Sequence, residues 1–157
     1  MFGNKKNHRR HAVVYMDRSG DTAIIVPLHY NGAGGFLFED VEPIVIRTPN
    51  DPESLGTTIK RALMASAIRP ESADRIGKLT DWPAFKSSRK KSVRQFESAF
   101  IRIDVSGMNE ANLFYNIEGW PDKNAEVRVL ASASAFRPEE LGERCMRVWR
   151  ACRDKVL

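Results

Sequence analysis

The sequence predicts an α+β fold, in which an antiparallel sheet carries two amphipathic helices on one face and the chain consists of two β-β-β-α halves. Three observations lead to this prediction. Short apolar runs alternate with brief polar turns, two amphipathic segments start with nearly the same residues, and each segment follows a group of apolar runs. Short connections favour antiparallel pairing of successive strands, and the apolar face of such a sheet needs helices to cover it.

The first half begins with the apolar runs "AVVYM" and "TAIIVPL", joined by the turn "DRSGD". Such runs bounded by turn residues are typical of strands. A helix is expected over 52–68, because Pro52 suits the first turn of a helix and Leu55, Ile59 and Leu63 recur at helical spacing. The expected strands of this half cover 12–16, 22–28 and 36–38, with 43–47 left open as a fourth.

The second half repeats this order after a short helix expected around 91–98. Its last segment again begins Pro-Glu and carries apolar residues at helical spacing, which predicts a helix over 138–154. The expected strands of this half cover 99–105, 112–119 and 125–132.

The two predicted helices share an unusual start. Aligning 52–66 with 138–152 gives six identities in fifteen positions, including the glycines Gly56 and Gly142. A glycine inside a helix costs about 1 kcal/mol relative to alanine. Its occurrence at the same place in both helices predicts that each helix start lies close to another backbone.

The chain has 157 residues, which indicates one domain. No apolar run approaches the ~20 residues of a membrane span, and the start "MFGNKKNHRRHAVV" lacks the apolar stretch of a signal peptide. These features predict a cytoplasmic protein. The expected organisation is a mobile basic tail over 1–10 and one domain over 11–157, with halves 11–68 and 92–157 and an irregular linker over 69–91.

The formal net charge of +5 hides segments of opposite sign. Residues 1–18 carry five basic and one acidic side chain, and 86–94 carry five basic and none acidic. By contrast, 39–53 and 104–126 each carry five acidic and one basic side chain. Signed patches of this kind steer partners, and a partner meets the local charge of one segment instead of the net charge of the chain.

The sequence lacks a convincing catalytic or metal-binding set, so we expect no enzyme activity, no metal and no cofactor. His8 and His11 lie near the basic tail, and His29 precedes the loop "NGAGG", where a surface histidine is expected. This loop lacks the pattern of a phosphate-binding loop. Cys145 and Cys152 are seven residues apart on a predicted helix, about 10 Å along its axis, so they cannot form a disulfide and are expected to be buried thiols.

Three motifs together resemble one bacterial family. "PESLG" at the first helix, "IEGW" at 117–120 and "PEELG" at the last helix resemble the immunity proteins of contact-dependent growth inhibition systems, the CdiI type. The resemblance covers roughly residues 22–68 and 92–152. It implies a cytosolic protein without catalytic activity that binds the C-terminal toxin domain of its cognate CdiA effector, 1:1, and neutralises it. Many such toxin domains are nucleases.

The resemblance gives no fixed toxin-binding residues, so the contact surface is predicted from charge. The acidic loops of the second half are the first candidate, and a toxin with an acidic surface would favour the basic run instead. The acidic candidates are Asp104, Glu110, Asp122 and Glu126, and the basic candidates are Lys86, Arg89, Lys90 and Lys91.

A nucleic-acid-binding module is the alternative function. The basic tail and the run "KSSRKKSVR" resemble the electrostatic footprint of such proteins. The expected strand order differs from that of the common aromatic-sheet RNA module, however, so nucleic acid is the less favoured partner.

Overall fold

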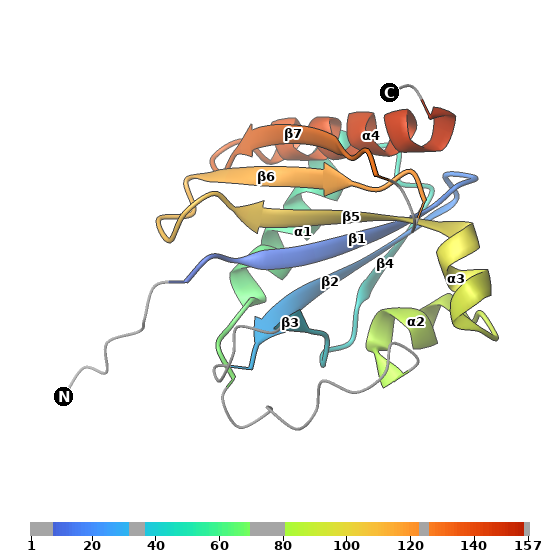
Figure 1. Cartoon of the computed structure of the whole chain (residues 1–157). Helices are drawn as coiled ribbons and strands as arrows, with labels where there is room; N and C mark the ends of the chain where they lie inside the picture. Colours follow the sequence, from blue (N-terminus) through green and yellow to red (C-terminus); the bar gives the residue numbers. More distant parts are fainter. Residues whose placement is uncertain (1–7, 32–36, 70–80, 123–125, 156–157) are drawn as a thin grey trace.

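The computed structural model describes residues 8–31, 37–69, 81–122 and 126–155. Within these residues the chain forms one seven-stranded antiparallel sheet and four helices, which confirms the predicted α+β class (Figure 1). The first half contains β1 (His11–Asp17), β2 (Thr22–Tyr30), β3 (Leu37–Phe38), β4 (Ile44–Arg47) and α1 (Pro52–Ala65). Next come α2 (Pro83–Ser88), α3 (Val93–Ala99), β5 (Phe100–Gly107), β6 (Phe114–Gly119), β7 (Val129–Ser134) and α4 (Pro138–Asp154).

The sheet joins two similar halves along its centre. The strand order is β3-β2-β1-β5-β6-β7, and β4 also pairs with β2. The units β4-β2-β1 and β5-β6-β7 therefore meet where β1 pairs with β5, with Val14 opposite Ile103. Each unit is followed by one long helix, as the sequence predicts, and α1 and α4 lie on the same face of the sheet (Figure 1).

The repeated glycines mark the crossing of these two helices. A Cβ atom on Gly56 would lie 1.7 Å from the carbonyl oxygen of Pro138, and one on Gly142 would lie 1.8 Å from that of Pro52. The repeated Pro and Gly residues thus contact each other across the crossing. The predicted close backbone approach is confirmed, and it explains why both helices carry the same start.

The local signals for the helices are also present. Pro52 stands at the start of α1, and the Asp51 side chain accepts a hydrogen bond from the Glu53 N–H at 3.2 Å, which caps the helix. Helix α4 has Glu139 and Glu140 in its first turn, where carboxylates favour the positive end of the helix.

The main core lies between the sheet and the α1–α4 pair. It takes alternate residues of the central strands and the apolar stripes of both helices. Cys145 and Cys152 are free and buried in it, and burial raises the pKa of Cys145 to about 12. The prediction of buried, unpaired thiols is confirmed.

On the opposite face of the sheet, helices cover only the strands of the first half. Helices α2 and α3 place Phe85 and Phe96 over β1 and β2, where they pack with Tyr15 and Phe100 in a second core. Residues 83–88 of the predicted irregular linker are therefore helical, because Ala84 and Phe85 bury an apolar surface there. Residues 70–80 of that linker lie outside the described residues.

Two further expectations need correction. Residues 8–10 are no free tail, because His8 Nε2 lies 3.0 Å from the Ser66 carbonyl oxygen and the Arg10 N–H donates to Asn112 Oδ1 at 2.9 Å. Residues 1–7 of the predicted tail lie outside the described residues, as does most of the loop over 29–35.

His29 is fully buried, so the expectation of a surface histidine is wrong. The residue lies within β2, one position before its end, and its Nδ1 accepts a hydrogen bond from the Ala67 N–H at 3.0 Å. Its Nε2 lies 3.3 Å from Asp40 Oδ1, and Arg69 Nη1 donates to the other oxygen of this carboxylate at 2.8 Å. Buried polar groups need such partners, so this cluster ties β2 to the end of the first half.

Candidate functional site

The half of the sheet built by β5, β6 and β7 has one face that no helix of the described residues covers. Strand residues alternate between the two faces, and the residues facing the core are apolar. The register aligns the outward residues in rows across the three strands. We call this surface the open face, and its residues are Arg102, Asp104, Ser106, Phe114, Asn116, Glu118, Leu130, Ser132 and Ser134.

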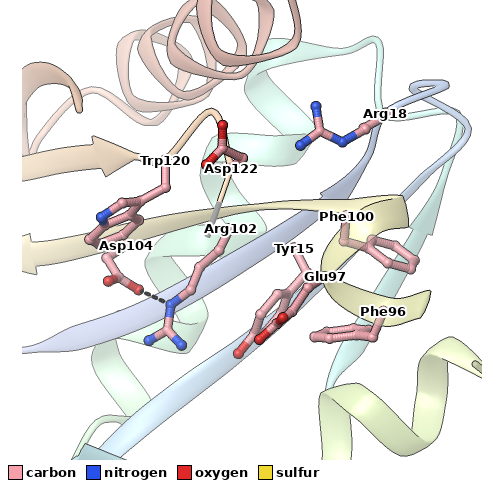
Figure 2. Close-up of a pocket in the computed structure, with 9 residues that line it drawn as sticks. All are labelled: Tyr15, Arg18, Phe96, Glu97, Phe100, Arg102, Asp104, Trp120 and Asp122. Atoms are coloured by element: carbon pink, nitrogen blue, oxygen red, sulfur yellow. Dashed lines mark hydrogen bonds and ion pairs between the residues drawn. The ribbon is translucent and has the colours of Figure 1, made fainter. Parts of the chain in front are cut away.

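A recess lies where the open face meets α3. Its cavity volume is about 370 Å³. Figure 2 shows Trp120, which directly follows β6, on one side of the recess and Arg102 near the middle. Phe96 of α3 and Phe100 at the start of β5 lie on the other side. The lining residues are Tyr15, Arg18, Phe96, Glu97, Phe100, Arg102, Asp104, Trp120 and Asp122.

Tyr15 is fixed by a buried carboxylate. Its hydroxyl donates to Glu39 Oε2 at 2.7 Å, and the Ala84 N–H donates to Glu39 Oε1 at 3.1 Å. Burial raises the pKa of Glu39 above its ordinary value, although both hydrogen bonds act against this change. These bonds connect β1, the segment after β3 and the start of α2, so the wall of the recess is held rigidly.

Arg102 and Asp104 form the charged base of the recess. Arg102 Nε donates to Asp104 Oδ1 at 3.0 Å, and the guanidinium carbon lies 5.9 Å from the centre of the Tyr15 ring. Burial raises the pKa of Asp104, Glu118 on the next strand adds to this rise, and Arg102 opposes it. The Arg102 side chain is nevertheless 40% exposed, because the recess opens to solvent above it.

A second ion pair continues the row of charges. Glu118 stands directly opposite Asp104, and like charges in that position destabilise a sheet. Arg128 offsets this repulsion by pairing with Glu118, and its guanidinium lies 5.3 Å from the Trp120 ring centre. The open face therefore presents alternating charges beside an aromatic ring.

Arg18 closes one end of the recess. Its Nε donates to the Ser98 carbonyl oxygen at 3.0 Å and its Nη2 donates to the Pro121 carbonyl oxygen at 2.7 Å. The side chain thus links α3 to the segment after β6, and it holds the two sides of the recess at a fixed separation.

The structure brings together two of the four predicted acidic residues. Asp104 and Asp122 both line the recess. Glu126 is exposed in the segment before β7, and Glu110 lies in the turn between β5 and β6, at the other end of the hairpin. The six residues of β6 span about 20 Å. Strand length therefore separates Glu110 from Asp104 and Asp122, and the contact of all four residues with a toxin stays a prediction.

The four predicted basic residues lie along one short stretch. Lys86 is in the last turn of α2, Arg89 is its left-handed C-cap with φ 59°, and Lys90 and Lys91 follow in the turn to α3. This basic turn belongs to the same side of the sheet as α3, which forms one wall of the recess.

The sequence reasoning missed Tyr15, Arg102 and Arg128. The strand "AFIRIDV" did contain a usable signal, since Arg102 and Asp104 alternate with apolar residues and must face away from the core. The placement of α3 beside them carries no such local signal.

Comparison with known proteins identifies the fold. No family model matches the sequence, and no curated protein matches it. Among solved structures, the chain is similar to a protein of unknown function, NMB0488, from Neisseria meningitidis, with a TM-score of 0.72 and 20% sequence identity. The match covers 97% of this chain and 99% of the other. At this identity the likeness establishes the architecture alone.

Two further observations concern only the part of the chain that the structure describes. It contains no group of three or more His, Cys, Asp or Glu side chains placed to hold a metal ion. None of its helices is both long and apolar enough to cross a membrane.

Proposed function

We propose that this chain is an immunity protein of the CdiI type, which binds the C-terminal toxin domain of its cognate CdiA effector, 1:1, in the bacterial cytosol and blocks it. The contact surface in this proposal is the open face with the adjoining recess. The observation that carries the proposal is the exposure of large apolar side chains on the open face. Phe114 is 55% exposed and Leu130 is 70% exposed.

This composition fits a protein interface better than an ordinary surface. Exposed apolar patches rimmed by polar residues mark interaction sites, and interfaces are enriched in aromatic residues and arginine. The open face combines Phe114 and Leu130 with Arg102, and Trp120 and Arg128 stand at its border. Phe136, two residues beyond β7, is 71% exposed.

The size of the surface indicates how far the contact would extend. Three strands of about six residues offer about 300 Å² of sheet. A specific interface buries about 800 Å² per partner. The proposed contact therefore includes the recess and the exposed part of α3 as well as the open face.

Co-expression with the toxin domain encoded immediately upstream tests the proposal. We expect the wild-type chain to keep cells alive and to co-purify with the toxin domain as a 1:1 complex. Leu130→Glu places a charge in the proposed contact and should abolish both effects. The matched control is Met64→Glu, because Met64 is 55% exposed on α1, behind the sheet, and this variant should protect like the wild type.

Cell death and absence of a complex with the wild-type chain would refute the immunity function. Full protection by Leu130→Glu, together with loss of protection by Met64→Glu, would instead place the contact on the helical side.

Nucleic-acid binding is a second candidate, supported by the basic turn after α2. Lys86, Arg89, Lys90 and Lys91 lie there within six residues, and Arg94 follows on α3. Phosphate contacts would make RNA affinity fall steeply with salt. Fluorescence anisotropy with a labelled single-stranded RNA should then show a salt slope that Lys90→Glu with Lys91→Glu reduces by about 1.4, or ~0.7 for each lost phosphate contact. Absence of binding at low salt would remove this candidate.

A further inference from the structure

Strand β7 forms one border of the sheet, and its outer edge is open. Among the described residues β7 pairs only with β6. Since the Ala135 N–H donates to the Leu113 carbonyl oxygen, the alternation of the ladder turns the backbone groups of Leu130, Ser132 and Ser134 outward. The six residues of β7 include no charged residue and no proline, which commonly protect strand edges. This edge can therefore accept a further strand.

The outward groups of β7 fit a second copy of the same strand. In an antiparallel pair about a two-fold axis at Ser132, this residue meets its own counterpart and Leu130 meets Ser134 of the other copy. All three outward residues are then used, and the strands exchange about six hydrogen bonds, two for each directly opposed pair. The Leu130 side chain, which is 70% exposed, gains a cross-strand neighbour in this arrangement.

Helix α4 lies along the same border as β7. It begins three residues after the strand ends and runs back along it (Figure 1). Arg144 marks the side of α4 that faces the edge, because its Nη1 donates to the Ser132 carbonyl oxygen at 2.8 Å. Glu140, whose carboxylate lies 3.1 Å from Arg144 Nη2, and Arg147 follow the same side of the helix at three- and four-residue spacing. These three charges would face a second copy.

The charges on this side of α4 are complementary to themselves. The two-fold axis at Ser132 sets the two α4 helices in opposite directions, with Arg144 of each copy near the axis. Glu140 of each copy then comes opposite Arg147 of the other, so an attractive pair forms twice. Arg147 is exposed and forms no ion pair with another described residue. The Glu140 carboxylate has two oxygens, so it can serve Arg144 of its own chain and Arg147 of the other copy.

The size of the border indicates a weak association. The 17 residues of α4 span about 26 Å. A border of that length, with one helix layer and one sheet layer together about 20 Å thick, offers about 500 Å² per copy. Standard interfaces bury about 800 Å² per partner, and smaller ones belong to weak or transient complexes. We therefore expect a dissociation constant in the micromolar range.

We propose that β7 and α4 form the interface of a two-fold homodimer, in which the sheet continues from one chain into the other. This inference goes beyond the proposed function. Because the sheet is extended in its own plane, the open face stays accessible, and each chain of the dimer can still bind one toxin domain.

Sedimentation velocity of the full chain over a concentration series, without any toxin domain, tests the inference. The wild-type chain should change from monomer to dimer in the micromolar range. Arg147→Glu should weaken the dimer about tenfold, because the symmetry turns two attractive contacts into repulsive ones. The double variant Glu140→Arg with Arg147→Glu should restore the wild-type dissociation constant, because the two charges are exchanged between the positions.

Two further variants locate the interface. Arg61→Glu is the matched control, because Arg61 is exposed and holds the place in α1 that Arg147 holds in α4 when the two helices are aligned. This variant should leave the dissociation constant unchanged. Ser132→Pro removes an N–H that β6 does not use, and edge strands tolerate proline at such positions, so it should keep the fold and abolish the dimer. Should Ser132→Pro unfold the chain, the charge variants still decide the matter.

A wild-type chain that stays monomeric at every concentration up to the millimolar range would overturn the inference. So would equal weakening by Arg61→Glu and Arg147→Glu, or a double variant that dimerises no better than Arg147→Glu. Since the measurement uses this chain alone, its result is independent of the co-expression assay. Protection of cells by a monomeric chain would remove the dimer and keep the immunity function, whereas a dimer without protection would do the reverse.

Discussion

At the scale of single residues, Glu39 shows how a buried carboxylate affects stability. Only 3% of this residue is exposed, and burial raises its pKa. In the unfolded chain a glutamate loses its proton near pH 4.3. As the pH rises above that value, the unfolded state releases the proton first, so the free energy of unfolding falls until the pH passes the raised pKa of the folded state.

Glu39→Gln should remove this loss of stability. The glutamine can accept from the Ala84 N–H through its oxygen and donate from its amide to the Tyr15 oxygen, so each partner keeps a hydrogen bond to position 39. Urea denaturation between pH 4 and pH 7 should show that the variant gains stability relative to wild type as the pH rises. Identical pH dependence in the two proteins would contradict this expectation.

His11 lowers the stability of the protein in acid, whereas Glu39 lowers it as the pH rises. Desolvation, with a contribution from Arg9, lowers the pKa of His11 to about 4. The folded state then binds a proton less readily than the unfolded state, so stability is lost as the pH falls from about 6.5 through 4. Solvent screening of this half-buried ring limits the loss to about 1 kcal/mol.

His11→Phe should keep the packing of the ring and remove its titration. The His11 ring meets Tyr30 edge to face, with 5.4 Å between centres, and phenylalanine can make the same contact. Thermal unfolding at pH 4 and pH 7 should show a smaller difference for the variant than for wild type. If the melting temperatures at pH 4 and pH 7 differ as much in the variant as in wild type, another group causes the loss of stability in acid.

At the scale of elements, the crossing of α1 and α4 allows little substitution. A methyl group at position 56 would overlap the backbone carbonyl of Pro138, which cannot move without shifting α4. Gly56→Ala should therefore cost about 3 kcal/mol or more, despite the higher helix propensity of alanine. Thr57→Ala, one residue along on the exposed side, is the control and should be neutral. If Gly56→Ala and the control variant have the same melting temperature, α1 and α4 can move apart at the crossing at little cost, which would contradict this prediction.

The free edge of β7 is another feature of element scale. The Ala135 N–H donates to the Leu113 carbonyl oxygen, so alternation along the pair directs the backbone groups of Leu130, Ser132 and Ser134 away from β6. Arg144 on α4 covers part of this edge by donating from Nη1 to the Ser132 carbonyl oxygen at 2.8 Å.

Arg144→Ala should keep the fold and increase self-association, because exposed strand edges pair with other chains. Sedimentation velocity over a concentration series should show larger species for the variant than for wild type. Equal sedimentation of the two proteins at every concentration would mean that Arg144 has no role in protecting the edge.

At the scale of the whole molecule, the fold could be predicted because its signals are local. The proline and glycine of each helix start, the turns and the apolar periods stand within short windows. They predict the strands and the helices α1, α3 and α4 in their observed order, whereas α2 lies in a stretch expected to be irregular. The site depends on long-range placement instead. The packing of Phe96 against Tyr15 and the bond from Arg18 to Ser98 fix α3 beside the open face. The sequence therefore indicated Asp104 and Asp122 but not the recess that these long-range contacts form.

The helix crossing also has a consequence for the chain during synthesis. Gly56 and Pro138 lie 82 residues apart, and closing a loop of that length costs about 4 kcal/mol of chain entropy before the contact forms. Until the ribosome has delivered α4, the nascent first half exposes the apolar stripe of α1 and the unpaired edge of β1, which makes it the species most exposed to aggregation. Folding of this chain is therefore expected to be completed only after α4 has been synthesised, and to be slow compared with that of an all-helical protein of the same length.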